Sequence, residues 1–175
     1  NIYLGIYMRK NLKKIILLTA LFLVSFVLYG KNVSIMILQN NGSDKITEAS
    51  RVFENLVLNT LFDCGHIVTN EPISLIDDYD YVSEKGFDAA VDGFMDYFIE
   101  IEIEYDREKS SNPDAVLLEN VKSVEYVIRN VRDGSIFYKS EKILPNLEMV
   151  SNQFVGFNKF TCEIADKINL KLNGK

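Results

Sequence analysis

The chain has 175 residues, of which 47% are hydrophobic and 25% charged, with a formal net charge of −6. This length is enough for one domain of ordinary size with a buried core. Beyond residue 30 the acidic excess is larger, because 15 Lys and Arg stand against 25 Asp and Glu, a formal charge of about −10. Such a balance disfavours nucleic acid and anionic lipid as partners, since both are bound mainly through Lys and Arg.

The amino-terminal residues 1–30 have the layout of a secretory signal peptide. A basic stretch after Met8 leads into the apolar run 15–28, whose 14 residues are fewer than the roughly 17–25 of a membrane-spanning helix. We therefore expect translation from Met8, export on this segment to the periplasm or cell envelope, and cleavage that leaves residues 31–175 as a single globular domain. The cleavage position fits the small-x-small pattern only loosely, so an uncleaved amino-terminal anchor remains the alternative.

Hydrophobic periodicity predicts a strand and then a helix directly after the amino-terminal segment. The nearly continuous apolar residues 33–38 predict a buried central strand. Apolar residues in steps of three and four then predict an amphipathic helix over residues 44–62. Asp44 is the expected cap at the start of this helix, and Gly65 is the expected residue at its end.

The next predicted elements are a short strand, a weaker helix and a strand with alternating faces. Residues 66–69 predict the short strand, and residues 74–85 predict the helix, which Gly86 is expected to stop. Residues 99–105 alternate apolar and acidic side chains, which predicts one face in the core and one in water.

Two further strands are predicted over residues 124–131 and 136–143, joined by a turn at Asp133 and Gly134 that is typical of a hairpin. A terminal amphipathic helix is predicted over residues 151–172. The class is therefore α/β with an α+β tendency, a mixed sheet of about five strands with helices packed on it. One parallel crossover from the first strand is followed by an antiparallel meander.

This order, together with the Gly86-Phe87-Asp88 element and the turn at Asp133, resembles a fold shared by three groups of envelope proteins. They are the curli secretion lipoproteins, the outer-membrane activators of penicillin-binding proteins, and the amino-terminal domain of TolB. The lipid-bearing cysteine and the pore-forming insertions of the lipoproteins are missing from this chain. The resemblance implies a periplasmic domain that contacts other envelope proteins and has no catalytic activity.

Glu100, Glu102 and Glu104 are the best candidates for chemistry, because three carboxylates on one strand face can bind a cation or act as an acid and base pair. Alternate residues of a strand lie roughly 6.6–6.8 Å apart, however, whereas Ca²⁺ needs oxygens at about 2.3–2.6 Å on several sides. We therefore expect a solvated face whose carboxylates pair across the sheet with basic residues. The candidate partners are Lys122, Arg129 and Lys139.

Two other groups of residues suggest chemistry less strongly. Asp77, Asp78 and Asp80 lack the glycine and glutamate of a calcium loop, so a helix start rich in negative charge is the simpler interpretation. His66, the one histidine, lies beside Cys64 without a GxSxG element, which favours an ordinary histidine at a strand edge over a catalytic base.

The sequence has two cysteines, Cys64 and Cys162, and we expect them to be buried free thiols. Pairing in an oxidising compartment is the alternative, because closing so long a loop stabilises by ~4 kcal/mol in the chain-entropy model. Neither cysteine has the spacing of a metal site.

These residues favour an exported binding or assembly module without catalytic activity, metal or cofactor, whose partner is an envelope protein. Aromatic residues on strands are more often packed in the core or on a sheet face, which is the favoured interpretation here. If they cluster on one face instead, four tyrosines are candidate anchors for that interface: Tyr97, Tyr105, Tyr126 and Tyr138. Two alternatives stay open. One is a small hydrolase or metal-dependent enzyme that uses Glu100, Glu102 and Glu104 or His66, and the other is a structural subunit that self-associates through an edge strand.

Overall fold

The computed structural model describes residues 30–40, 44–148 and 150–174, without the side chains of residues 78–80. Lys31–Lys175 form one compact unit. The predicted signal peptide, residues 1–30, lies outside the described residues apart from Gly30. Within the described part, no helix combines the length and the apolar character needed to span a membrane.

A six-stranded mixed sheet forms the centre of this unit, with strand order β2-β1-β4-β5-β6 and β3 beside β1. Its strands are β1 (Asn32–Asn40), β2 (Ile67–Asn70), β3 (Ser74–Leu75), β4 (Tyr97–Tyr105), β5 (Val121–Asn130) and β6 (Ile136–Lys139). Strand β1 pairs in parallel with β2, β3 and β4, whereas β4, β5 and β6 form an antiparallel meander. The predicted mixed α/β sheet is confirmed, with a second parallel crossover between β3 and β4.

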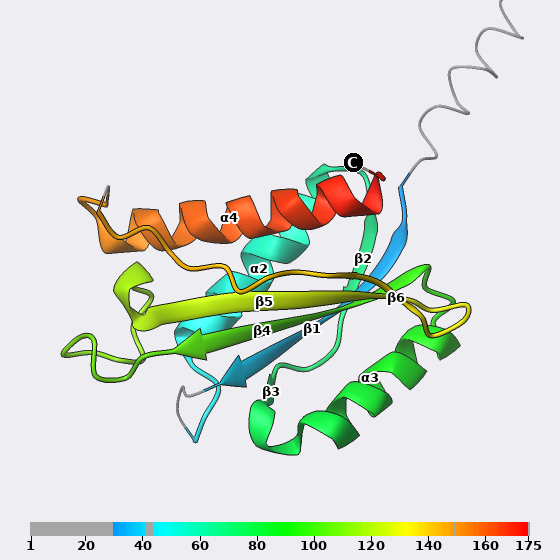
Figure 1. Ribbon diagram of the computed structural model, residues 1–175, viewed down its shortest axis with the longest axis horizontal. Helices are drawn as coiled ribbons and strands as arrows, with labels where there is room; N and C mark the ends of the chain where they lie inside the picture. Colours follow the sequence, from blue (N-terminus) through cyan, green and yellow to red (C-terminus); the bar gives the residue numbers. More distant parts are fainter. Residues whose placement is uncertain (1–29, 41–43, 149, 175) are drawn as a thin grey trace, which may run out of the picture. The chain divides into compact units, whose positions relative to one another are not determined.

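Three helices cover the two faces of the sheet (Figure 1). Helices α2 (Glu48–Asp63) and α4 (Gln153–Leu172) pack together on one face, and α3 (Tyr79–Asp92) packs on the other. Short 3-10 turns at Ile76–Asp78 and Leu118–Asn120 precede α3 and β5. The two parallel crossovers therefore place α2 and α3 on opposite sides of β1.

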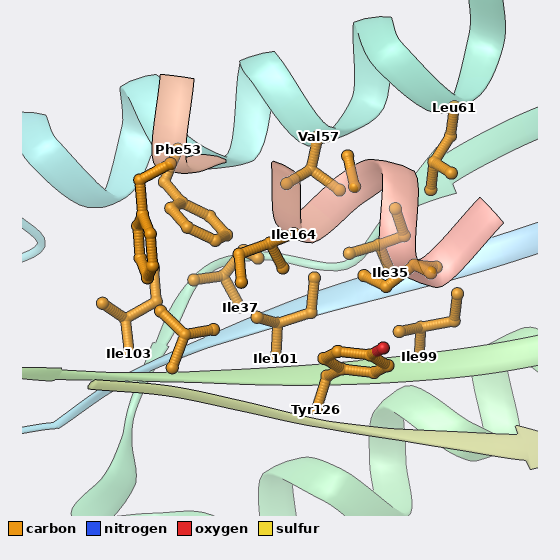
Figure 2. Packing of buried hydrophobic residues seen from close by; sticks show 14 of the residues in the cluster. Ile35, Ile37, Phe53, Val57, Leu61, Ile99, Ile101, Ile103, Tyr126 and Ile164 are labelled. Carbon is orange, nitrogen blue, oxygen red and sulfur yellow. The ribbon is translucent and has the colours of Figure 1, made fainter. Parts of the chain in front are cut away.

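The main core lies between the sheet and the helices α2 and α4 (Figure 2). Alternate residues of β1 and β4, among them Ile35, Ile37 and Ile101, point toward Phe53 of α2 and Ile164 of α4. All five side chains are fully buried. The period-two pattern of the strands and the helical pattern of α2 and α4 thus meet in one core, as the sequence predicts.

The predicted bounds of the helix at residues 74–85 are wrong at both ends. Ser74–Leu75 form β3, α3 begins at Tyr79, and the helix continues through Gly86 to Asp92. A Cβ on Gly86 would lie 3.0 Å from Phe98 Cζ and 3.1 Å from Met36 Sδ. Glycine at this position allows α3 to approach the sheet closely, and it does not stop the helix.

Several other boundaries differ by a few residues. Helix α2 is capped by Thr47, whose hydroxyl accepts a hydrogen bond from the Ser50 amide at 3.2 Å, and not by Asp44. The predicted end at Gly65 is confirmed, with a positive φ of 91°. Strand β6 ends at Lys139, because the pairing with β5 is interrupted before Ile143 forms an isolated bridge to Val124.

Candidate functional site

The acidic face of β4 lies on the side of the sheet that α3 covers, and its three glutamates have three different environments. Glu100 is 3% exposed, so the predicted solvated face is wrong at this residue. Glu102 and Glu104, further along β4, are half-buried. The difference arises because α3 covers only the part of the strand that contains Glu100.

Glu100 connects three elements. It accepts a hydrogen bond from the hydroxyl of Ser83 on α3. Its Oε2 lies 2.9 Å from Nε of Arg129 on β5, an ion pair that is not aligned as a hydrogen bond. The predicted pairing with Arg129 is confirmed. Through these two contacts the buried carboxylate holds α3 against β4 and β5.

Glu104 is held by two lysines. Lys122 Nζ lies 2.6 Å from Oε1, Lys142 Nζ lies 2.7 Å from Oε2, and the Ser123 hydroxyl donates to Oε2 at 3.1 Å. Hydrogen bonds from Lys122 and then Lys142 lower the pKa of Glu104 from 4.5 to about 2. The carboxylate therefore stays ionised in the folded state at pH values where it is protonated in the unfolded chain.

This depressed pKa predicts an acid-dependent loss of stability. A carboxyl group with a lower pKa in the folded state stabilises above its unfolded pKa of about 4.5, and that contribution disappears as the pH falls through about 2. We expect the difference in unfolding free energy between the wild type and Glu104→Gln to shrink between pH 5 and pH 2. Urea titrations at each pH measure it. Glu108→Gln, at an exposed loop carboxylate, is the control, and an equal slope in both variants would contradict the prediction.

Glu102 is the third glutamate on the acidic face of β4. Its Oε1 accepts a hydrogen bond from Asn40 Nδ2 at 2.6 Å, and it lies directly across the β4–β5 pair from Glu125. Each of the three glutamates thus has polar partners of its own. Among the described residues there is no group of three histidine, cysteine or acidic side chains placed to hold a metal ion.

His66 is buried at the junction of α2, β2 and α4. Its Nδ1 accepts a hydrogen bond from the Lys31 amide at 3.1 Å, and its Nε2 lies 2.9 Å from Asn169 Oδ1. An Nδ1 that accepts leaves the proton on Nε2, which then donates to Asn169. Both ring nitrogens are therefore used to join the start of β1 to the end of α4, and the imidazole has no free lone pair for a substrate.

The two cysteines are free thiols as predicted, but the predicted burial is wrong at Cys64, which is exposed, while Cys162 is half-buried. Burial, followed by the charges of Asp166 and Asp63, raises the pKa of Cys64 above 9.0. A raised pKa lowers the thiolate fraction that a nucleophile needs. The environment of Cys64 therefore disfavours the hydrolase alternative.

Asp77, shortly before α3, borders an open polar hollow of about 650 Å³ at the carboxyl ends of β1 and β4. Its lining includes Asp77, Asn40, Asp106 and Lys122. The side chains of Asp78 and Asp80 lie outside the described residues, so the calcium-loop question there stays untested.

The four tyrosines that are candidate interface anchors pack against other side chains of the sheet, two of them buried and two half-buried. Tyr105 and Tyr126 are buried, because they alternate with the outward residues of β4 and β5 on the face beneath α2 and α4. Tyr138 contacts Tyr126 with a ring separation of 5.7 Å, and Tyr97 contacts Phe137 at 5.2 Å. The favoured packing interpretation is confirmed for Tyr105 and Tyr126, and Tyr97 and Tyr138 are half-buried.

Exposed apolar side chains instead form two surfaces that the sequence does not reveal. The first, the Lys31 surface, lies at the end of the sheet where Lys31 leads into β1, and consists of Phe62, Ile67, Val91, Phe94, Ile136, Phe137 and Leu170. The second, the α4 groove, lies at the opposite end of the sheet, beside the first turns of α4. Val155 is the exposed apolar residue of its lining, and Leu144, Leu147 and Phe154 are exposed apolar residues close to it in sequence. Nucleotide-binding glycine loops and catalytic triads have sequence signatures, but an exposed apolar surface has none.

The chain is similar to several solved structures, of which three are described here. PelC from Paraburkholderia phytofirmans, a dodecamer, gives a TM-score of 0.50 at 16% identity, over 82% of this chain and 88% of that chain. TolB from Acinetobacter baumannii gives 0.44 at 13% identity, over 82% and 29%, and a lipoprotein from Neisseria meningitidis gives 0.41 at 11% identity, over 77% and 95%. At these identities the likeness shows the fold alone.

The likeness to PelC thus supports the predicted fold. The specific resemblance to curli secretion lipoproteins and to the activator lipoproteins stays a prediction. No curated protein sequence matches the chain. A family model described as "Uncharacterised protein" matches residues 32–151, and the chain belongs to that family.

Proposed function

We propose that this chain is an exported, non-catalytic assembly module of the cell envelope that associates with further copies of itself. The observation that carries the proposal is the α4 groove. Residues 1–30 direct the export in this proposal, with the signal-peptide layout of the sequence as their support.

The α4 groove has the composition of a protein interface. It is a hollow of about 310 Å³ lined by Leu118, Val150, Val155 and Phe160, with Lys159 and Glu163 among its polar lining residues. A Cβ on Gly156 would lie 2.5 Å from Val150 Cγ1, so glycine lets the segment before α4 pack directly on the helix. Apolar residues with charged neighbours are typical of interfaces between subunits.

A second copy is the occupant that the comparison favours. PelC, whose fold this chain shares over most of both chains, is a dodecamer. Closed rings form when two different surfaces of one subunit meet, and the unpaired edges of β2 and β6 lie at opposite ends of the strand order here. The alternative occupant is a different envelope protein.

Sedimentation measures the association directly. Residues 31–175 hold the whole described core, so this domain can be studied in solution. We expect its mass to rise with concentration, and Val155→Glu to weaken association at least about tenfold, or roughly 1.4 kcal/mol, because a charge would enter an apolar interface. Glutamate is also a good helix former, so the exposed site should tolerate it.

Leu170→Glu is the matched control, since Leu170 is an exposed apolar residue of the same helix outside the groove. Association that survives Val155→Glu but not Leu170→Glu would assign the interface to another surface. A monomer at every concentration would overturn self-association, and capture of a different envelope protein through the groove would then be the outcome to test.

A further inference from the structure

We propose that the Lys31 surface rests on a lipid bilayer, with Phe94 inserted at the level of the headgroups. The proposal uses the uncleaved alternative for residues 1–30. It does not rest on the α4 groove or on self-association, because it concerns the opposite end of the domain.

The Lys31 surface gathers apolar side chains from helix ends, strand starts and the Phe94 turn at one end of the sheet. Helices α2, α3 and α4 all end there, as does β5, while β1, β2, β4 and β6 begin there. Seven of the twelve exposed large hydrophobic side chains of the described residues belong to this surface. Phe94, at 88% exposed, is the most prominent of them. Exposed apolar side chains gathered at one end of a domain indicate a contact with a partner or a membrane.

Phe94 has a backbone conformation that favours glycine. Its φ is 55°, and among the described residues it is the one non-glycine residue with positive φ. The amide of Phe94 bonds to Val91 O at 3.0 Å and that of Met95 bonds to Ala90 O at 3.0 Å. These two bonds are the Schellman motif, in which the left-handed residue is usually glycine.

Helix α2 also ends in a Schellman motif, with the usual glycine at the left-handed position. The Gly65 amide bonds to Phe62 O at 2.8 Å, the His66 amide bonds to Leu61 O at 3.2 Å, and Gly65 takes the positive φ. In α3 the glycine, Gly93, stands one position too early. Phe94 therefore has a strained backbone although its side chain makes little contact with the core of the domain. Backbone strain of this kind is concentrated at functional positions.

The position of Lys31 favours lipid as the occupant. The apolar run 15–28 ends three residues before Lys31, and three residues span at most about 10 Å. Lys31, Val91 and Phe94 line one hollow of about 510 Å³. A retained apolar run that enters the membrane interface, even without spanning the bilayer, therefore holds Phe94 close to the lipid.

The charges of this surface select the kind of lipid. The acidic residues Asp63, Asp92 and Asp133 are exposed near its apolar residues, beside the basic Lys31 and Arg132. The three helix ends also contribute partial negative charge. The Lys31 surface itself is therefore not expected to attract anionic headgroups, and its contact with zwitterionic lipid should depend little on salt.

Tryptophan fluorescence tests the proposal, because the chain contains no tryptophan. Phe94→Trp places one reporter in the Lys31 surface. Tyr81→Trp places one at an exposed aromatic position, 71% accessible, near the other end of α3, about 20 Å away by the helix rise. Each full-length variant is incorporated into phosphatidylcholine vesicles with and without brominated acyl chains.

We expect the Phe94→Trp emission to shift to shorter wavelength and to be quenched by the brominated lipid, with no effect of salt, while Tyr81→Trp stays unchanged. Equal, water-like emission from both variants would overturn the proposal, as would failure of the full chain to bind vesicles. A shift that appears without vesicles and grows with protein concentration would instead assign the surface to a second copy. Residues 31–175 without lipid test self-association separately.

A second variant tests the strain. Phe94→Gly should raise the melting temperature of residues 31–175, because glycine accepts positive φ and the exposed ring makes little contact with the core. A fall in melting temperature would show that Phe94 serves the fold and would remove the argument for a lipid contact.

Discussion

Replacement of Arg129 by alanine is expected to lower the free energy of unfolding by about 3 kcal/mol. The guanidinium is 30% exposed, but its partner Glu100 is only 3% exposed. Removal of one member of a buried ion pair leaves the other charge without compensation, which typically costs about 3–5 kcal/mol, and the partial exposure of Arg129 places the effect at the lower end. The hydrogen bond from Ser83 alone would remain. Urea denaturation of the isolated domain measures the change.

Two further variants show whether burial is the cause. Lys122→Ala removes a more exposed partner of Glu104, which keeps its contact with Lys142, so a loss of less than about 1 kcal/mol is expected. Combining Glu100→Leu with Arg129→Met removes both buried charges and should recover most of the lost stability. If Arg129→Ala costs no more than Lys122→Ala, the Glu100 pair does not hold α3 on the sheet.

The second large effect is expected at Phe53 in the centre of the main core. Its ring is fully buried and meets Phe157 edge-on, with centroids 6.4 Å apart. Phe53→Ala should destabilise the domain by about 3–5 kcal/mol, because the substitution removes buried apolar surface and leaves a cavity between α2, α4 and the sheet. Thermal and urea unfolding both report it.

Phe62→Ala provides the matched control, since Phe62 belongs to the same helix but is 68% exposed. Its removal should change the free energy of unfolding by no more than about 0.5 kcal/mol. A similar loss in both variants would mean that α2 contributes through helix propensity and not through packing of its buried face.

The elements that could be predicted from the sequence are those whose pattern is local. Residues 33–38 form a buried strand because both faces of β1 are covered, and the alternation in β4 correctly assigns Ile99, Ile101 and Ile103 to the core. The turn at Asp133 and Gly134 joins β5 and β6 as predicted, with a positive φ of 70° at Gly134. In each case a residue's neighbours in sequence carry the signal.

The errors concern contacts between distant segments. A glycine such as Gly86 looks the same in the sequence whether it ends a helix or allows a helix to pack closely on a sheet. Its role here follows from its contacts with Phe98 and Met36, which are distant in sequence. Glu100, Glu102 and Glu104 have one pattern, but α3 buries only the first of them. The exposure of Phe94 and Val155 depends on what the rest of the chain leaves uncovered, so neither surface could be predicted.

The central place of β1 has a consequence for how the domain forms in time. This strand is the first to be synthesised, and its residues 33–38 are completely buried in the finished sheet. Its longest partner, β4, begins 64 residues later, where Val33 pairs with Tyr97. Until β4 emerges, a continuous apolar strand lacks its main neighbour, a state that invites aggregation. A newly made chain therefore exposes this apolar strand to other chains over this interval.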